Sequence, residues 1–318
     1  MNDAAAHIQQ HLMQHFKLHQ PTIRPITYGV INSNYLIETS DQKYLFKSYN
    51  LSDEKNVAFE LSILDFLSTK RFPCTRIVSD RRQRLYHFFD AKPAVLLNYI
   101  PGRMITDITP EQMHRIGSGV GLLHRLLMDF RQPIERVTWE VVDMECHIQN
   151  RSAEIIQKNY PDAIEFVGFV AREFQKLDFP DNLPQGLTHQ DVKPENIIID
   201  NTGRISFVDF NDCYRGTLLV DVMTTIIWAC FKKDALDTDL LEAYVRGYAD
   251  ERSLASAERE YFYPMFLFRL LREAFVWPMR FSPQVAYENG ERFIRRYRHV
   301  AADEHRYRKM IASYLAAS

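Results

Sequence analysis

The stretch 187–212 constrains the fold and the chemistry of this chain more than any other segment. It reads LTHQDVKPENIIIDNTGRISFVDFND. The apolar runs Ile197–Asp200 and Ile205–Val208 predict two short strands, and residues 201–204 between them predict a hairpin loop. Polar side chains stand on both sides of the hairpin, so we expect the fold to bring them together at its open end.

The open end of this hairpin is predicted to hold a metal ion. If Asp200 pairs with Ile205, then Asn196 lies across from Asp209. Amide and carboxylate oxygens are the ligands that Mg²⁺ prefers, with water and phosphate completing its shell. Asp191 precedes Asn196 by five residues, in the loop that leads to the same end. Asn196 and Asp209 are therefore candidate metal ligands, and the alternative is that the aspartate only forms a turn at the end of its strand.

The spacing H-x-D-x-x-x-x-N, followed by a hairpin and an apolar-apolar-Asp triplet, resembles that of the protein-kinase-like small-molecule kinases. This group comprises aminoglycoside phosphotransferases, choline kinases and the homoserine kinases of the same fold. The resemblance covers roughly residues 20–280. It implies a two-lobed, kinase-like α+β fold, with a small β-rich N-lobe and a larger, mostly helical C-lobe. It also implies an enzyme that uses ATP and Mg²⁺ to phosphorylate a hydroxyl group of a small polar molecule.

The same resemblance assigns roles to individual residues. Asp191 would be the catalytic base or would orient the acceptor hydroxyl, and His189 would support the loop. Lys193 would contact the γ-phosphate, or else be a loop lysine that faces solvent. Asp221 matches a later buried aspartate of the family, although no acidic residue follows Gly216 as it does in many relatives.

A lysine and a glutamate in the first hundred residues are predicted to form an ion pair. Lys47 lies within the predicted strand Tyr44–Tyr49. Glu60 falls inside the apolar stripe of the predicted helix Asp53–Ser68, at about 100° per residue. A carboxylate in an apolar face is costly unless it is paired, so we expect Lys47 to be its partner. The resemblance to the kinases implies that Glu60 then holds Lys47 on the nucleotide phosphates. A partly exposed glutamate at the edge of the stripe is the alternative.

Two further segments resemble nucleotide-binding parts of the family. The loop G-V-I-N-S-N-Y begins at Gly29 and resembles the homoserine-kinase-type loop, in which main-chain N–H groups with Asn32 and Ser33 would cover the phosphates. The segment L-N-Y-I-P-G resembles the hinge, where the backbone of Tyr99 and Ile100 would bind adenine. A hairpin turn and an edge strand ended by Pro-Gly explain these two segments equally well.

The pattern of apolar residues changes near residue 100. Before it, strands are predicted at 22–28, 34–39, 44–49 and 94–99, with one helix at 53–68. After it, a helix begins at Pro110 with Thr109 as its cap, and further helices are predicted at 143–160, 163–177, 217–232, 238–249, 255–277 and 303–317. We therefore predict an N-lobe over 1–98, a hinge over 99–102 and a C-lobe over 103–318.

Composition and charge exclude several classes of protein. Hydrophobic residues make up 46% of the chain, which excludes wholesale disorder. Lys plus Arg number 39 and Asp plus Glu 41, so the basic excess of a nucleic-acid or anionic-membrane binder is missing. No apolar run approaches the roughly 20 residues that span a bilayer, and the N-terminus lacks an apolar leader. We expect a cytoplasmic monomer or homodimer without a nucleic-acid or membrane partner.

Neither the cysteines nor the N-terminal histidines are expected to bind a metal. The four cysteines are scattered without a C-x-x-C pair, so we interpret them as reduced thiols. His7, His11, His15 and His19 recur every four residues and would form a stripe on a helix. A terminal helix packed on the N-lobe explains this spacing as well, and no cysteine or carboxylate clusters with them in the sequence.

Two other functions stay open at this point. A protein kinase is disfavoured because Gln190 replaces the arginine of the loop motif and D-F-N replaces D-F-G, with only 12 residues from Asp209 to Asp221. A non-catalytic nucleotide-binding scaffold on the same fold is disfavoured by the complete set of polar site residues. The acceptor is open among amino acids, amino alcohols, sugars and aminoglycosides. The candidate acceptor residues are Asp212, Trp228, Tyr263, Arg272, Glu273 and Trp277.

Overall fold

The computed structural model of the protein describes residues 3–16, 18–26, 32–51, 53–133, 136, 138–158, 160, 162–281 and 283–316. The chain forms two compact units. The first unit comprises Met1–Ile105, Phe130–Ile134 and Glu195–Asp212, and the second comprises Thr106–Asp129, Glu135–Pro194 and Cys213–Ser318. The hairpin predicted from the sequence thus belongs to the first unit, while the loop that precedes it belongs to the second. The predicted lobe boundaries stay a prediction.

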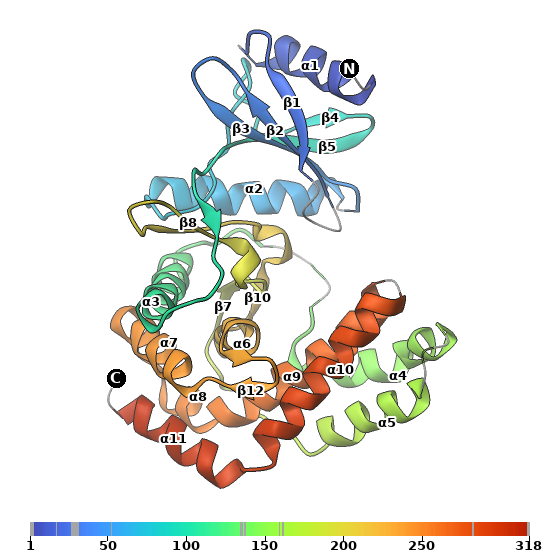
Figure 1. The fold of residues 1–318 in the computed structure, drawn as a ribbon, viewed down its shortest axis with the longest axis vertical. Coiled ribbons are helices and arrows are strands. Elements are labelled where there is room, and N and C mark those ends of the chain that lie inside the picture. The colour runs from blue at the N-terminus through green and yellow to red at the C-terminus, as the bar shows by residue number, and fades with distance from the viewer. Residues whose placement is uncertain are drawn as a thin grey trace. The chain divides into compact units, whose positions relative to one another are not determined.

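An antiparallel sheet of five strands organises the first unit (Figure 1). In spatial order its strands are β1 (Thr22–Ile26), β2 (Ser33–Glu38), β3 (Lys43–Ser48), β5 (Lys92–Asn98) and β4 (His87–Phe89). Helix α1 (Asp3–His15) lies on one face of the sheet and helix α2 (Glu54–Thr69) on the other. Because side chains alternate along a strand, Phe46 of β3 faces α1 and its neighbour Lys47 faces α2.

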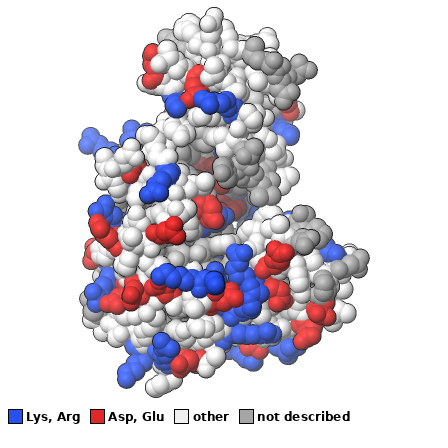
Figure 2. All heavy atoms as spheres, in the orientation of Figure 1, with Lys and Arg blue, Asp and Glu red and all other residues white. Residues whose placement is uncertain are grey.

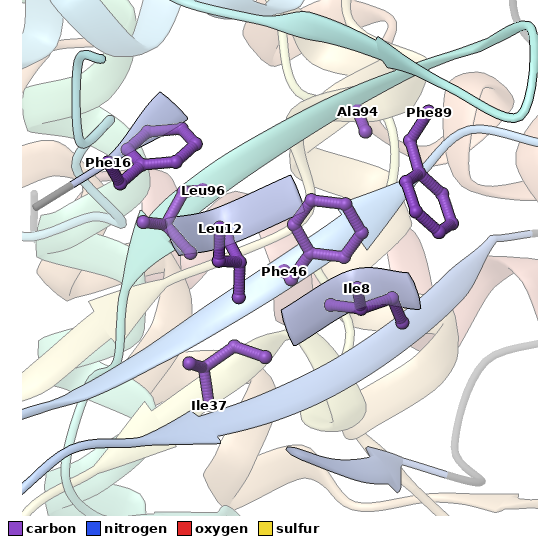
Figure 3. Close-up of a cluster of buried hydrophobic side chains, with 8 residues drawn as sticks. All are labelled: Ile8, Leu12, Phe16, Ile37, Phe46, Phe89, Ala94 and Leu96. Carbon is purple, nitrogen blue, oxygen red and sulfur yellow. The ribbon is translucent and has the colours of Figure 1, made fainter. Parts of the chain in front are cut away.

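A hydrophobic cluster attaches α1 to the sheet (Figure 3). Its members are Ile8, Leu12 and Phe16 from the helix side and Ile37, Phe46, Phe89, Ala94 and Leu96 from the strands. Ile8 and Leu12 are four residues apart, so they project from the same side of the helix. Burial of each large aliphatic or aromatic side chain contributes about 1.5–3 kcal/mol. The predicted terminal helix on the N-lobe is therefore present.

Helix α2 begins where the sequence predicts it. Asp53 is the N-cap, and its side chain accepts a hydrogen bond from the Asn56 N–H at 2.8 Å. The buried side of the helix contains Val57, Leu61, Leu64 and Leu67, the stripe read from the sequence. Glu60 is buried with them.

The predicted hairpin consists of β8 (Ile197–Ile199) and β9 (Ile205–Phe207). Its register differs by one residue from the predicted one, because Ile205 pairs with Ile199 and not with Asp200. Asp200 leaves the ladder since its Oδ1 accepts hydrogen bonds from the N–H groups of Thr202 and Arg204, at 2.8 and 3.0 Å. The loop is thereby lengthened at its start, and every pair in the hairpin moves by one.

The second unit is mostly helical. Its longer helices are α3 (Pro110–Leu127), α4 (Val141–Gln157), α5 (Ala163–Phe174), α6 (Leu218–Ala229), α7 (Thr238–Glu251), α9 (Phe262–Arg280), α10 (Pro283–Ala301) and α11 (Glu304–Ala316). The capping box of Thr109 and Gln112 at the start of α3 is confirmed. One prediction is wrong, because the helix expected over 255–277 is broken into α8 (Ser256–Glu260) and α9. Helix α10 was not predicted.

Helices α3 and α7 pack at very short range. A Cβ built on Gly247 of α7 would stand 1.9 Å from the carbonyl oxygen of His114, and one built on Gly117 of α3 would stand 2.2 Å from that of Tyr244. Such backbone-to-backbone contact excludes any side chain at these positions. The glycines thus set the distance between α3 and α7.

The surface carries both signs of charge. On the face drawn in Figure 2, lysine and arginine atoms are interspersed with those of aspartate and glutamate. Among the residues that the structure describes, no helix is long and apolar enough to cross a membrane.

Candidate active site

In the first unit, Lys47 bridges two carboxylates. Its Nζ lies 3.0 Å from Oε1 of Glu60 on α2 and 3.0 Å from Oδ1 of Asp209, which follows the hairpin. Lys47 is 5% exposed and Glu60 2%, whereas the side chain of Asp209 is 44% exposed. The predicted ion pair of Lys47 and Glu60 is present, and Asp209 is its third member.

Burial and charge act in opposite directions on this triad. Burial alone lowers the pKa of Lys47, but the carboxylates of Asp209 and Glu60 outweigh it and hold that pKa well above its ordinary value. Burial raises the pKa of Glu60, and the lysine only partly offsets this. The ring of Tyr49 lies 4.7 Å from Lys47 Nζ and covers it further. The lysine is therefore charged and fixed, with its ammonium beside the exposed Asp209 carboxylate.

The hairpin end carries the two predicted metal ligands. With the register shifted by one, Asn196 lies opposite Val208, whose N–H donates to the Asn196 carbonyl at 3.0 Å. Asp209 leaves the ladder in a left-handed conformation, with φ of 63°. That conformation costs a residue other than glycine about 1–2 kcal/mol. A carboxylate offers about four acceptor sites, so the Lys47 contact does not use up Asp209, and an amide with a carboxylate fits a hard cation such as Mg²⁺.

In the second unit, the loop around Asp191 is held by one buried carboxylate. Asp221, at the start of α6, is fully buried. Its Oδ2 accepts from the His189 N–H at 2.8 Å and its Oδ1 from the Gln190 N–H at 2.7 Å. Burial raises the pKa of Asp221, but these bonds and the contact with His124 prevail and lower it. Asp221 thus acts as the anion to which the loop backbone is tied.

A relay of hydrogen bonds fixes Asp221 from behind. His124 Nε2 donates to Asp221 Oδ2 at 2.9 Å, and its Nδ1 lies 2.9 Å from the hydroxyl of Tyr248. Arg252 donates to that hydroxyl at 2.9 Å and forms a two-point ion pair with buried Glu258. An ionised carboxylate only accepts hydrogen bonds, so Nε2 of His124 carries a proton toward Asp221. His124 of α3 is therefore part of the loop's support.

Asp191 itself is partly exposed. Its Oδ2 lies 2.9 Å from Nζ of Lys193, and its N–H donates to Nδ1 of His189 at 3.3 Å. The ring of Trp228 lies 5.7 Å from the same Nζ. Lys193 thus contacts the carboxylate that the resemblance places at the chemical step, and His189 supports the loop as expected.

Helix α9 contributes a second set of partners to this loop. Arg272 donates to Oε1 of Gln190 at 2.8 Å, and Arg269 donates to the Gln190 carbonyl at 3.4 Å. Glu273 accepts from Arg269 and, at 2.9 Å, from the indole of Trp277. Sequence reasoning missed Arg269. The signal was there, because an arginine inside the apolar helix F-Y-P-M-F-L-F-R must find a partner.

Other predicted residues are placed differently. Asn32 and Ser33 contact Asn50, whose N–H donates to Asn32 Oδ1 at 3.4 Å and whose Nδ2 donates to Ser33 Oγ at 3.1 Å. Gly29 lies outside the described residues. The N–H of Tyr99 donates to the Lys43 carbonyl at 3.3 Å, within the sheet.

The candidate acceptor residues do not form one group. Tyr263 is buried and donates to the carbonyl of Val300, so it belongs to the packing of α9 on α10. Three candidates lie on α9 and connect to Gln190. Arg272 contacts Gln190 directly, whereas Glu273 and Trp277 are linked to it through Arg269, which bonds to both Glu273 and Gln190. Trp228 of α6 is in ring contact with Trp277, at 5.7 Å between centroids.

Residues 22–257 match the phosphotransferase enzyme family. The chain belongs to this family. The region covers both the Lys47 strand and the Asp221 helix, so the family assignment includes every predicted catalytic and metal-binding residue. The protein is accordingly an enzyme of the kinase type.

Two relatives of similar length to this chain are homoserine kinases. The chain is 24% identical over 249 residues to the homoserine kinase of Zymomonas mobilis, covering 76% of this chain and 75% of the relative. It is 25% identical over 242 residues to the homoserine kinase of Neisseria meningitidis, covering 76% and 77%.

Solved structures confirm the kinase-like α+β fold. A choline kinase from Cryptosporidium parvum matches with a TM-score of 0.69 at 13% identity, covering 97% of this chain and 99% of that one. A microcompartment-associated aminopropanol kinase matches with a TM-score of 0.67 at 16% identity, covering 94% and 98%. The expected fold class is therefore confirmed.

Proposed function

We propose that the protein transfers the γ-phosphate of ATP, with Mg²⁺, to a hydroxyl group of a small polar molecule. The observation that carries this proposal is the buried Lys47, fixed between Glu60 and Asp209 in a chain of the phosphotransferase family. A fixed ammonium beside an exposed carboxylate suits phosphate and a divalent cation together. Phosphoryl transfer depends mainly on such positioning and on charge neutralisation.

Each residue then has one role in the proposed reaction. Lys47 binds nucleotide phosphate oxygens, and Asn196 with Asp209 would hold Mg²⁺, which neutralises the charge of the phosphates when bound. Asp191 orients the acceptor hydroxyl and takes its proton as the new P–O bond forms. Lys193, next to Asp191, contacts the transferred phosphoryl group.

The nucleotide base would be bound by the hinge segment. Since the Tyr99 N–H is used inside the sheet, adenine recognition would fall to the Tyr99 carbonyl and the Ile100 N–H. Asn32 and Ser33, tied to Asn50, support the end of the phosphate-covering loop, where β2 begins. Gly29 would let the backbone of that loop approach the phosphates.

The first acceptor to test is a hydroxyl amino acid of the homoserine type. Both curated relatives named above are homoserine kinases, and each match covers about three quarters of both chains. The structural neighbours are named for amine-bearing alcohols, aminopropanol and choline.

The test is release of ADP from Mg·ATP across a panel of homoserine, choline, ethanolamine, hydroxylysine, hexosamines and aminoglycosides. We expect one compound to stimulate release, and Asp191→Asn to abolish the stimulation while Asp181→Asn, an exposed carboxylate of the same unit, retains it. ATP binding without turnover on any compound would favour a scaffold. Phosphate incorporated into protein would favour a protein kinase, and failure to bind ATP would refute the kinase function.

A further inference from the structure

Three histidine side chains of the first unit meet away from the proposed active site. His11 and His15 lie one turn apart on α1, and His87 is the first residue of β4. The nearest ligand nitrogens of the three rings all lie within 4.8 Å of one another. The ring centroids are 4.6 Å apart for His11 and His15, and 4.5 Å for His15 and His87.

We propose that His11, His15 and His87 form a binding site for a transition-metal ion of the Zn²⁺ class. Imidazole is the common ligand of Zn²⁺, and two histidines at i and i+4 of a helix with a third from elsewhere supply three ligands. Bound nitrogens in a tetrahedral shell stand about 3.3 Å apart, from Zn–N distances of about 2.0–2.1 Å. Small ring rotations of the half-buried His11 and His15 close the remaining gap.

The surroundings of the cluster fit a metal in three respects. Nε2 of His11 is buried and has no hydrogen-bond partner among the described residues, which is a cost unless a ligand satisfies it. The ring of His11 packs edge-on against the rings of His87 and Phe89, with centroids 5.4 Å apart in each pair, so it is held beside the other two imidazoles. Asp80 Oδ2 lies 3.2 Å from Nε2 of His87, so a carboxylate stands beside the third imidazole and favours a cation there.

Charges around the site act in both directions. Asp80 and Asp90 raise the affinity for a cation, whereas Arg81, Arg82 and Arg84 lower it. Arg84 is paired with Asp80 at 2.9 Å, and its guanidinium also lies 3.4 Å from Nδ1 of His87, so a metal ion on that nitrogen would displace it. The binding itself would come from the three imidazole nitrogens, which meet in a partly buried site. A bound ion would connect α1 to β4 and reinforce the hydrophobic cluster of Figure 3.

The experiment is a Co²⁺ titration of untagged, chelator-treated protein in excess Mg²⁺ without nucleotide, followed by competition with Zn²⁺. The excess Mg²⁺ occupies the oxygen-ligand site, so the visible absorption of low-coordinate Co²⁺ reports the histidines. We expect one equivalent per chain and a loss of at least tenfold in affinity for His15→Gln. We expect a 10- to 100-fold loss for Asp80→Asn. His19→Gln, an exposed histidine just beyond α1, is the matched control and should bind as the wild type does.

Histidine ¹⁵N spectra of the unmodified protein during a Zn²⁺ titration give an answer that needs no variant. Shifts confined to three imidazoles support the site. Absence of stoichiometric Co²⁺ binding, equal affinity of His15→Gln and wild type, or Zn²⁺ shifts at the exposed histidines alone would overturn it. The proposal does not depend on the proposed kinase reaction, because every readout is metal binding.

Discussion

Replacing Asp221 with asparagine tests the account of how the Asp191 loop is held. The carboxylate accepts three hydrogen bonds in full burial, two on Oδ2 and one on Oδ1. Asparagine has a single acceptor oxygen. In its better orientation it keeps the two donors on the Oδ2 side and turns its NH₂ group toward the N–H of Gln190.

The cost follows from counting those bonds. The Gln190 N–H is left buried without an acceptor, which costs about 1–3 kcal/mol. Each of the two remaining bonds loses its charge assistance, about 1 kcal/mol apiece. We therefore expect Asp221→Asn to lower the free energy of unfolding by about 3–5 kcal/mol at pH 7, and to lower kcat because the loop that carries Asp191 is loosened.

Urea unfolding followed by fluorescence and circular dichroism measures the loss, with Asp181→Asn as the exposed control. The pKa of Asp221 is lowered in the folded protein, so its contribution is complete above the unfolded pKa and is lost as pH falls through the folded value. The difference between variant and wild type should therefore shrink below about pH 4. A loss under about 1 kcal/mol at pH 7, with an unchanged m-value, would refute the reasoning.

Three other substitutions test the same structure. Glu60→Gln should lower kcat/KM for ATP by about 10- to 100-fold, or about 1.4–2.7 kcal/mol, because Lys47 keeps only Asp209 as a partner. Steady-state kinetics measures this loss beside the exposed control Asp65→Asn, and equal values for the two variants would contradict the role of Glu60 in holding Lys47. Gly247→Ala should destabilise or abolish the folded second unit because its Cβ meets a backbone carbonyl; a melting temperature like that of wild type would show the close contact to be wrong. Leu12→Ala should destabilise the packing of α1 in the cluster of Figure 3 by about 2–5 kcal/mol. A protease should then cleave α1 at a lower urea concentration than in the wild type, and cleavage at the same concentration would contradict this prediction.

The sequence predicted the parts of the site that depend on local pattern. Glu60 could be placed in a buried stripe because a helix advances by a constant angle, and an unpaired buried carboxylate is too costly to persist. Lys47 followed as its partner, and both are confirmed. The spacing from Asp191 to Asp209 was enough to predict a hairpin and the family, since these features are short in range.

The tertiary structure decided what depends on residues far apart in the chain. The hairpin register differs from the predicted one because the Asp200 side chain accepts hydrogen bonds from backbone N–H groups of the loop. The alternation of apolar residues along a strand carries no information on such side-chain bonds. Arg269 and Gln190 meet across 79 positions, and His87 joins the histidines of α1 across more than 70. The sequence alone therefore determined the chemical motif and most of the local elements. Tertiary packing determined which residues far apart in the chain pair with one another, because buried charges and polar atoms form hydrogen bonds with the groups that the fold brings close to them.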